Sequence, residues 1–197
     1  MKNNIIINIG RQFGSGGKDI ARELGLLMGF PVYDNELIIK AAQDSGISAE
    51  LFKCMDEKKN FFSFFNYGAE NYLNDNGLFQ IQSETIRNIA ENGSAIIIGR
   101  CADYILRELP NTINIYVTAP MEYRIQRTIE IEKINPEEAE SYIIKKDKQR
   151  ESYYNYYTFG DWGMASNYDF CIDSSILGIK GSAEMIKMYV DKVMENK

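Results

Sequence analysis

The stretch IIINIGRQFGSGGKD, residues 5–19, decides which fold we expect for this chain. Its first half is a β-branched run that ends at Gly10, which predicts a buried strand. Its second half is rich in glycine, and Ile20, Leu24 and Met28 follow it at helical spacing. Successive backbone N–H groups of such a turn can point inward, and the helix adds its positive N-terminal end. We therefore expect a site for an anion, most often phosphate.

Strands and helices alternate along the rest of the chain. Further strands are predicted over residues 31–33, 95–99, 113–117 and 168–172. Helices are predicted over residues 37–42, 81–89 and 101–109, from Pro120, from Asn135 and over 182–195. One more helix is expected after Ser48, whereas residues 58–77 have no clean period and are expected to form an irregular insert. This alternation predicts an α/β fold whose parallel sheet is covered on both faces.

The composition excludes several classes of protein. The 197 residues include no histidine, which rules out Ser-His-Asp and Cys-His catalysis and histidine-bound zinc. A net charge of −6 argues against a general nucleic-acid binder. No apolar run approaches the ~20 residues of a membrane span, and the first residues show no signal peptide, so we expect a cytoplasmic protein. Cys54, Cys101 and Cys171 are far apart and are expected to be reduced, buried and structural.

The glycine-rich turn partly matches a phosphate-binding P-loop. In the pattern GxxxxGK[ST], a lysine at the helix entrance reaches the nucleotide phosphates. Gly17 and Lys18 match this pattern, whereas Gln12 stands at its first glycine and Asp19 at its hydroxyl residue. If the pattern holds, the protein binds a nucleoside triphosphate here.

The same turn also partly matches the dinucleotide pattern GxGxxG. Gly14 and Gly16 fit this pattern, and Asp19 again replaces its last position. Asp34 follows Gly14 by 20 residues, where a ribose-binding carboxylate belongs. A purely structural turn, whose glycines only allow tight packing, is a third interpretation. The turn alone leaves all three open.

The distribution of arginine favours the P-loop. Five of the eight arginines lie between residues 100 and 150, namely Arg100, Arg107, Arg124, Arg127 and Arg150. Arg124 and Arg127 are three residues apart on one predicted helix, so both can face the same way. Arg100 directly follows a strand, and open α/β sheets bind ligands at such ends. Phosphoryl transfer needs positive charge near the phosphates, and hydride transfer does not. Arg107 is the exception among the five, because we expect it to be an ordinary surface charge.

Four short motifs occur in a characteristic order: Gly14-Ser15-Gly16-Gly17-Lys18, Ile98-Gly99-Arg100, Ala119-Pro120-Met121-Glu122-Tyr123-Arg124-Ile125-Gln126-Arg127 and Ile172-Asp173-Ser174-Ser175. Together they resemble the cytidylate kinase-like family of P-loop nucleoside monophosphate kinases. The resemblance runs over nearly the whole chain and is weakest between about residues 46 and 80. It implies a single P-loop kinase domain over residues 1–197, with a five-stranded parallel sheet, an acceptor-binding arm over 46–93 and a lid over 124–162.

The resemblance also implies transfer of a phosphoryl group from ATP, with magnesium as counter-ion, to a small nucleotide acceptor. The ATP phosphates would be held by Gly14, Ser15, Gly16, Gly17, Lys18 and Asp19. The transferring group would be neutralised by Lys18, Arg124, Arg127 and Arg150. The acceptor would be bound by Asp34, Arg100 and Asp103, with Arg100 on its monophosphate. The charged end of the lid would be Lys146 and Asp147.

The chain departs from the cytidylate kinase pattern at the acceptor and metal positions. Cytidylate kinases carry Gly-Arg-Asp where this chain has Gly99-Arg100-Cys101, and the carboxylate is displaced to Asp103. The segment after Asp34 lacks the Tyr-Arg usual near a pyrimidine. Neither Asp19 nor Ile20 offers a hydroxyl for magnesium, so the metal ligand is unassigned. A degenerate P-loop module that binds nucleotide and regulates a partner without turnover is the alternative, and a dinucleotide-dependent oxidoreductase ranks third.

Two aromatic stretches stand apart from these motifs. Residues 153–157, with Trp162, could stack on a base, although packing between lid and core is the favoured interpretation. Residues 61–67 could form a homodimer contact, line the acceptor arm or simply be buried.

Overall fold

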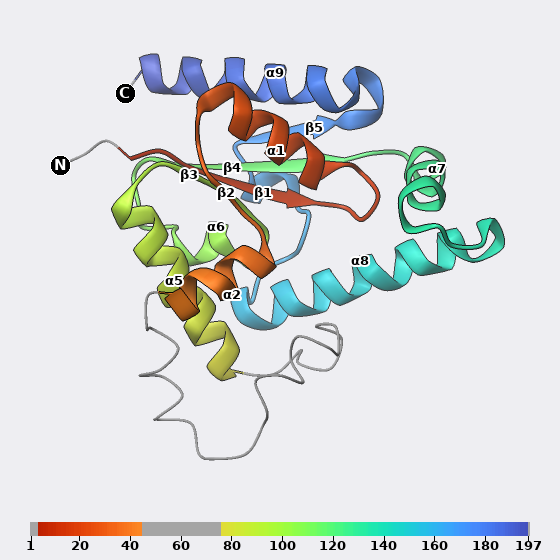
Figure 1. Cartoon of the computed structure of the whole chain (residues 1–197), viewed down its shortest axis with the longest axis horizontal. Helices are drawn as coiled ribbons and strands as arrows, with labels where there is room; N and C mark the ends of the chain where they lie inside the picture. The colour runs from red at the N-terminus through yellow and green to blue at the C-terminus, as the bar shows by residue number, and fades with distance from the viewer. Residues whose placement is uncertain (1–3, 45–75, 197) are drawn as a thin grey trace.

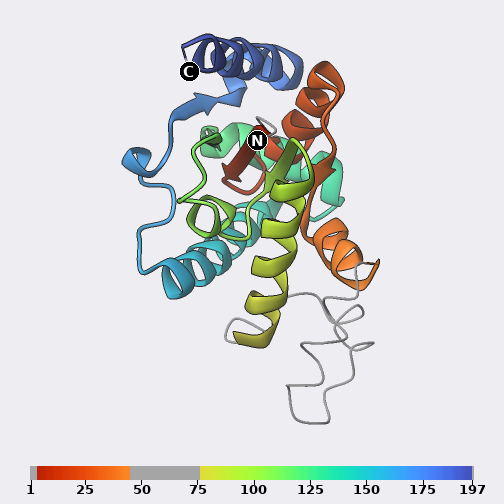
Figure 2. The same cartoon turned by 90° about the vertical axis from the view of Figure 1, so that its left-hand side faces the viewer.

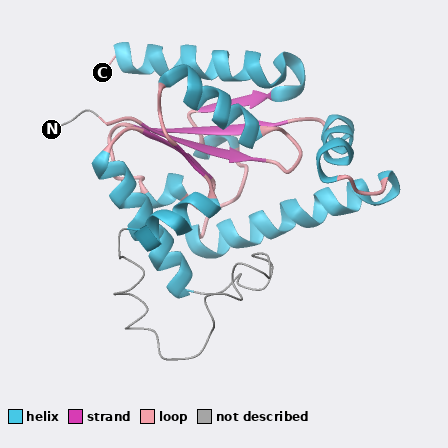
Figure 3. Cartoon of the chain, in the orientation of Figure 1, coloured by secondary structure: helices cyan, strands magenta, loops and turns pink. Residues whose placement is uncertain are grey.

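The computed structural model describes residues 4–44 and 76–196, and these residues contain one five-stranded parallel sheet. Its strands are β1 (Ile6–Arg11), β2 (Val32–Tyr33), β3 (Ala95–Ile98), β4 (Thr112–Thr118) and β5 (Phe170–Asp173). They lie in the order β2-β3-β1-β4-β5, and every neighbouring pair is parallel. All carboxyl ends therefore meet at one edge of the sheet (Figure 3). The predicted α/β fold is confirmed.

Helices cover both faces of this sheet, as predicted (Figures 1 and 2). One face carries α1 (Gly17–Met28) and α9 (Ser174–Glu195), which pack on each other. The other face carries the four helices α2 (Asn35–Asp44), α5 (Asn76–Asn92), α6 (Ala102–Ile105) and α8 (Pro136–Thr158). Two elements lie at the margins, namely α7 (Met121–Glu132) and a 3₁₀ turn, η2 (Ala165–Asn167). No helix in the described ranges is long and apolar enough to cross a membrane.

Isoleucine alternation in β1 builds both halves of the core. Ile7 and Ile9 are fully buried against α1 and α9, whereas Ile6 packs in the cluster on the opposite face. Successive side chains of a strand point to opposite faces, so this apolar strand supports two layers of helices. Asn8 shares the face of Ile6 and is buried, and its Nδ2 donates to Asn114 Oδ1 on β4 at 2.9 Å. A buried polar residue in the central strand marks the place where the core borders a polar site.

The helix starts that were predicted at Asn135 and at Pro120 are confirmed. The Asn135 side chain accepts a hydrogen bond from the Glu137 N–H at 3.1 Å, and Pro136 is the first residue of α8. Pro120 directly precedes α7. These signals are local, and they could therefore be read from the sequence.

Three predicted boundaries are wrong. The last helix begins at Ser174 instead of residue 182, because Asp173 caps it by accepting from the Ser175 N–H at 2.9 Å. Gly178, with a φ of +64°, is not helical, so α9 consists of two helices that meet at a kink at this residue. The last strand covers Phe170–Asp173, two residues beyond the predicted start. The helix predicted over 101–109 is only the four residues of α6.

The prediction that the cysteines are buried is confirmed for one of the two described cysteines and wrong for the other. Cys101 is buried, as predicted, whereas Cys171 is exposed, because it lies on the edge strand β5. Cys54, the helix after Ser48 and the aromatic stretch 61–67 lie outside the described residues, as does all but the end of the insert predicted over 58–77.

The junction of β5 and α9 ties the closing helix to the glycine-rich turn. The Ser174 hydroxyl is fully buried and donates to the Ser15 carbonyl at 2.6 Å, and it also lies 3.2 Å from the Thr118 carbonyl. This contact joins segments 159 residues apart in the sequence.

We predict that Ser174→Ala lowers the free energy of unfolding by about 1–3 kcal/mol, because the buried Ser15 carbonyl loses its donor. Urea denaturation measures this change. Ser141→Ala is the control, since the exposed Ser141 hydroxyl bonds only to the Glu138 carbonyl of its own helix. Equal losses in the two variants would contradict the prediction.

Candidate active site

The turn between β1 and α1 has a backbone that only glycine adopts easily. Gly14 and Gly16 have φ values of +78° and +81°, in the left-handed region. A Cβ on Gly14 would lie 2.8 Å from Thr128 Oγ1 and 2.9 Å from the Arg124 carbonyl. The turn therefore packs directly on α7, and a side chain at Gly14 would separate the two.

The same turn leaves backbone donors unused. Within residues 4–44 and 76–196, the N–H groups of Gly14, Gly16, Gly17 and Lys18 make no hydrogen bond. The Ser15 hydroxyl donates to the Gln12 carbonyl at 2.9 Å and closes the turn on itself. Free amides at the positive end of a 12-residue helix are suited to bind phosphate.

Lys18 is ion-paired to Asp34 across the entrance of α1. Its Nζ lies 2.7 Å from Asp34 Oδ2, and Asp34 Oδ1 accepts from the Leu37 N–H at 3.2 Å. Burial on its own would raise the pKa of Asp34, but the hydrogen bonds from Lys18 and Leu37 outweigh it and hold that pKa below its usual value. Asp34 thus positions Lys18 at the side of the turn that faces β2.

Two arginines of α7 hold the turn through carboxylates. Arg124 is 8% exposed, and its Nη1 lies 2.6 Å from Asp147 Oδ2 on α8. The other oxygen of Asp147 accepts from the Phe13 N–H at 2.7 Å. One turn further along α7, Arg127 Nη2 lies 2.7 Å from Asp19 Oδ2. Arg124 and Arg127 therefore reach the glycine-rich turn from the same side of α7.

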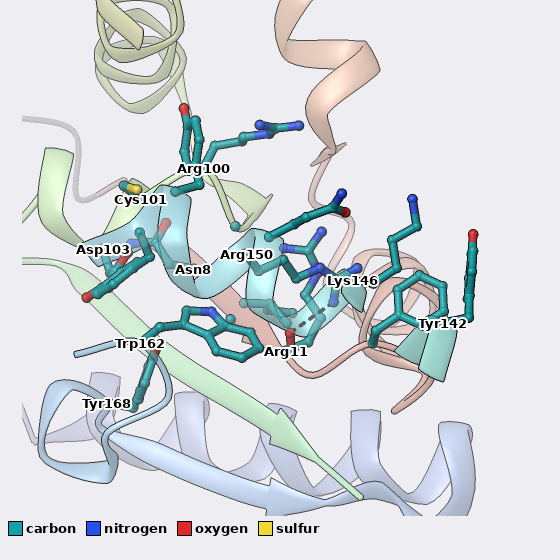
Figure 4. Close-up of a pocket in the computed structure, with 17 residues that line it drawn as sticks. Asn8, Arg11, Arg100, Cys101, Asp103, Tyr142, Lys146, Arg150, Trp162 and Tyr168 are labelled. Carbon is teal, nitrogen blue, oxygen red and sulfur yellow. Dashed lines mark hydrogen bonds between the residues drawn. The ribbon is translucent and has the colours of Figure 1, made fainter. Parts of the chain in front are cut away.

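A cavity of about 390 Å³ opens at the carboxyl edge of the sheet, between the ends of β1 and β3 and the helix α8. Figure 4 shows that its two ends differ in chemistry. The cationic end is formed by Arg11, Lys146 and Arg150, with Arg100 above it. The opposite end is aromatic and polar, and is formed by Asn8, Asp103, Trp162 and Tyr168.

The backbone that presents Arg100 is strained. Gly99, Arg100 and Cys101 follow one another with φ values of +68°, +59° and +56°. Left-handed backbone is unfavourable for residues with a Cβ, and such strain is found mostly at functional sites. The turn also explains why α6 starts late, since Cys101 is its left-handed N-cap. The Arg100 guanidinium lies 5.2 Å from the centre of the Tyr153 ring.

Asp103 is the carboxylate of the cavity. It accepts a hydrogen bond from the Tyr154 hydroxyl at 2.7 Å. Burial raises the pKa of Asp103 above its usual value, and the hydrogen bond from Tyr154 opposes this shift only in part. Burial likewise raises the pKa of the Cys101 thiol, so that thiol stays protonated and unreactive.

The predicted site residues fall into three groups in the structure. Arg100, Asp103, Lys146 and Arg150 line the cavity. Lys18 and Asp34 pair with each other, and Asp34 does not line the cavity. Arg124, Arg127, Asp19 and Asp147 form the ion pairs between the turn and the two helices α7 and α8. Arg107 is a surface residue, as expected, and its Nε lies 3.5 Å from Glu108 Oε1.

Sequence reasoning missed Arg11. It is the last residue of β1, and its side chain enters the cavity beside Arg150 (Figure 4). Its position at the carboxyl end of the first strand, next to the glycine-rich turn, was the available signal. Burial lowers the pKa of Arg11 well below its usual value, and the nearby charges of Arg150 and Arg100 lower it further.

The aromatic stretch on α8 serves two purposes. Tyr154 and Tyr157 are buried in the core, which confirms the packing interpretation for them. Tyr157 stacks on Phe79 of α5 with ring centres 4.0 Å apart. Tyr153 and Trp162 border the cavity, where a flat ligand group could contact them.

We predict that Asp103→Asn stabilises the protein at pH 7. Folding raises the pKa of Asp103, so above about pH 4, the pKa of an unfolded aspartate, the folded state binds more protons than the unfolded state. The free energy of unfolding therefore falls as the pH rises from this value through the pKa of the folded state. Asparagine removes the buried charge and still accepts from the Tyr154 hydroxyl. Urea denaturation at several pH values should show that the free energy of unfolding falls less steeply with pH in the variant than in the wild type.

The control is Asp161→Asn, because Asp161 is exposed. A variant at position 103 with lower stability at pH 7, and with the pH dependence of the wild type, would contradict this account.

Comparison with known proteins agrees with this geometry. The model of the cytidylate kinase-like family matches residues 6–176. Cytidylate kinase of Methanopyrus kandleri is 26% identical over 202 residues, which cover 98% of this chain and 96% of the relative. Cytidylate kinase of Pyrococcus abyssi is 26% identical over 196 residues and 98% of both chains.

Solved structures show the same fold. An uncharacterized protein from Eubacterium ventriosum has a TM-score of 0.76 and 30% identity, and the match covers 96% of this chain and 99% of that one. Shikimate kinase from Bacteroides thetaiotaomicron has a TM-score of 0.55 at 12% identity, covering 95% and 98% of the two chains, which speaks for the fold alone. The α/β fold is thus that of the P-loop kinases, and the chain belongs to the cytidylate kinase-like family.

Proposed function

We propose that this protein transfers the γ-phosphoryl group of ATP to the phosphate of a nucleoside monophosphate. Family membership and the kinase fold support a nucleotide-kinase type of function. The observation that carries the finer proposal is the arginine-lined cavity, which opens directly beside the phosphate loop at the carboxyl edge of the sheet. The loop and the cavity supply two adjacent anion sites, as transfer between two phosphates requires.

The phosphate loop is the donor side of the proposed reaction. The free amides of Gly14, Gly16, Gly17 and Lys18 would bind phosphate oxygens, and the helix end adds positive charge. The Lys18 ammonium, now on Asp34, would move onto the β- and γ-phosphates. Such donors stabilise the charge that spreads over the transferring group.

The cavity is the acceptor side. Arg100 and Arg150 would hold the acceptor phosphate at the cationic end. The base and sugar would lie toward Trp162 and Tyr168, with Asp103 available to accept from a donor group of the ligand. An oxygen of the acceptor phosphate then attacks the γ-phosphorus, the bond to the bridging oxygen breaks, and ADP leaves with both electrons of that bond.

The lid residues would exclude water from this transfer. Arg124 and Arg127 are anchored by Asp147 and Asp19, so a small movement of α7 relative to the loop would bring them to the phosphates. Closing the site strengthens each charge–charge contact and prevents hydrolysis of ATP.

Magnesium would enter with the ATP phosphates. No group of three carboxylate or thiol ligands exists in the described parts of the chain. Magnesium usually keeps several waters and takes only one or two carboxylates beside substrate phosphates, so the single carboxylate of Asp19 at the start of α1 fits that habit. Bound there, the ion would neutralise charge on the β- and γ-phosphates.

One observation favours a second function, in which nucleotide binding regulates a partner without turnover. Both lid arginines are occupied by carboxylates, and Asp147 also occupies the Phe13 N–H of the loop. If these contacts persist with ATP bound, phosphate would be held but not transferred.

A coupled assay with magnesium and ATP, run over the common ribo- and deoxyribonucleoside monophosphates, tests the proposal. We predict turnover with at least one monophosphate and a loss of at least about 100-fold in Lys18→Met, because a charge on the transferring group is removed. The variant should stay folded, since the Lys18 side chain is 46% exposed.

The control is Lys192→Met, which removes a lysine that is 74% exposed on α9, and it should keep full activity. Tight ATP binding without turnover of any monophosphate would instead favour the regulatory function.

A further inference from the structure

Three guanidinium groups of the cavity make no ion pair with a described carboxylate. No carboxylate of residues 4–44 or 76–196 lies within 4 Å of the guanidinium nitrogens of Arg11, Arg100 or Arg150. By contrast, Arg124 and Arg127 are ion-paired at 2.6 and 2.7 Å. The cavity therefore concentrates positive charge that no close ion pair neutralises, although Asp34 attracts Arg11 and Asp147 attracts Arg150 from farther away.

Arg11 is the most unusual of the three, because both its burial and the neighbouring arginines disfavour its positive charge. Burial lowers its pKa, and Arg150 and Arg100 add repulsion, whereas Asp34 attracts it only from beyond ion-pair distance. The charge of Arg150 is disfavoured by burial as well. Burying like charges is costly unless an opposite charge offsets them, so this arrangement suits an anionic ligand.

The fold provides a fixed place for the Arg11 side chain. Arg150 Nη1 donates to the Arg11 carbonyl at 3.1 Å, which joins α8 to the end of β1. Arg11 Nη1 occupies the space where a Cβ of Gly99 would lie, so glycine at that position lets the guanidinium pass. A Cβ on Gly17 would likewise lie 2.6 Å from Arg11 Cβ. Two glycines therefore leave room for this one arginine.

The position of Arg11 connects the two anion sites. It is followed immediately by Gln12 and Phe13 of the phosphate loop, and its guanidinium faces the cavity (Figure 4). Arg100 and Arg150 reach the same cavity from β3 and α8. Three forked guanidinium groups from three separate elements can contact several oxygens of one tetrahedral anion at once.

We propose that Arg11 is an acceptor-binding residue, and that with Arg100 and Arg150 it selects a phosphate monoester dianion over a neutral or carboxylate-bearing acceptor. The inference rests on the proposed function, which supplies the acceptor and its phosphate, and it adds Arg11 to the residues that bind this phosphate. A carboxylate has two oxygens and one charge, which leaves two of the three guanidinium charges uncompensated. A phosphate monoester brings three oxygens and a charge near −2 at neutral pH.

Thermal melting with defined ligands tests the proposal. Magnesium and a non-hydrolysable ATP analogue occupy the phosphate loop, and AMP, CMP, GMP, UMP and dTMP are compared with their nucleosides. We expect at least one monophosphate, and none of the nucleosides, to raise the Tm of the wild type. In Arg11→Met the concentration of that monophosphate needed for the same shift should rise about 10- to 100-fold, as for a lost charge-assisted hydrogen bond.

The Tm without ligands separates binding from structure. Arg11→Met removes an uncompensated charge and keeps an unbranched side chain, so its ligand-free Tm should equal or exceed that of the wild type. Arg11→Lys keeps the charge but not the fork, and should fall between the two in ligand affinity. The control is Arg107→Met, which removes a surface arginine paired to Glu108 and should leave ligand binding unchanged.

Two results would overturn the inference. One is an Arg11→Met protein that binds the monophosphate as tightly as the wild type. The other is a wild type whose Tm responds equally to nucleosides and monophosphates. Failure of the proposed function looks different: monophosphate binding that depends on Arg11, without any turnover, would remove the kinase activity and leave the acceptor site in place.

Discussion

Three guanidinium groups face one cavity at the carboxyl edge of the sheet, and no carboxylate in the described ranges pairs with them. Much of the nearby structure follows from this constraint. Gly99 lacks a side chain because Arg11 fills that space, and the left-handed turn from Gly99 to Cys101 places Arg100 on the wall of the same cavity. The strain and the repulsion reduce stability locally. In the proposed function a phosphate dianion offsets this reduction, because the bound ligand restores the balance of charge.

The glycine-rich turn is also held by close contacts with neighbouring elements. Gly14 lies against Thr128 and Arg124 of α7, and Ser174, the first residue of α9, donates to the Ser15 carbonyl. The loop is therefore fixed by two elements that are remote in sequence. The ion pair between Arg124 and Asp147 adds α8 to this assembly, so the glycine-rich turn, α7 and α8 are linked to one another.

The sequence predicts the fold well because its signals are local. Isoleucine runs, capping residues and the glycine-rich turn identify the sheet and most helices, and the arginines between residues 100 and 150 indicate where charge would gather. The sequence pattern does not predict Arg11 as a site residue, because its place depends on Gly99 and Arg150, which only folding brings beside it. The pairing of Lys18 with Asp34 and the exposure of Cys171 on an edge strand likewise depend on strand order. Spacing along the chain does not encode these relations.

A crystal structure with magnesium, a non-hydrolysable ATP analogue and the monophosphate that binds would test the central claim most directly. The account predicts the acceptor phosphate within hydrogen-bond distance of Arg11, Arg100 and Arg150, and the γ-phosphate of the analogue at the amides of the glycine-rich turn. A monophosphate bound outside this cavity, with the three guanidinium groups facing only solvent, would contradict it.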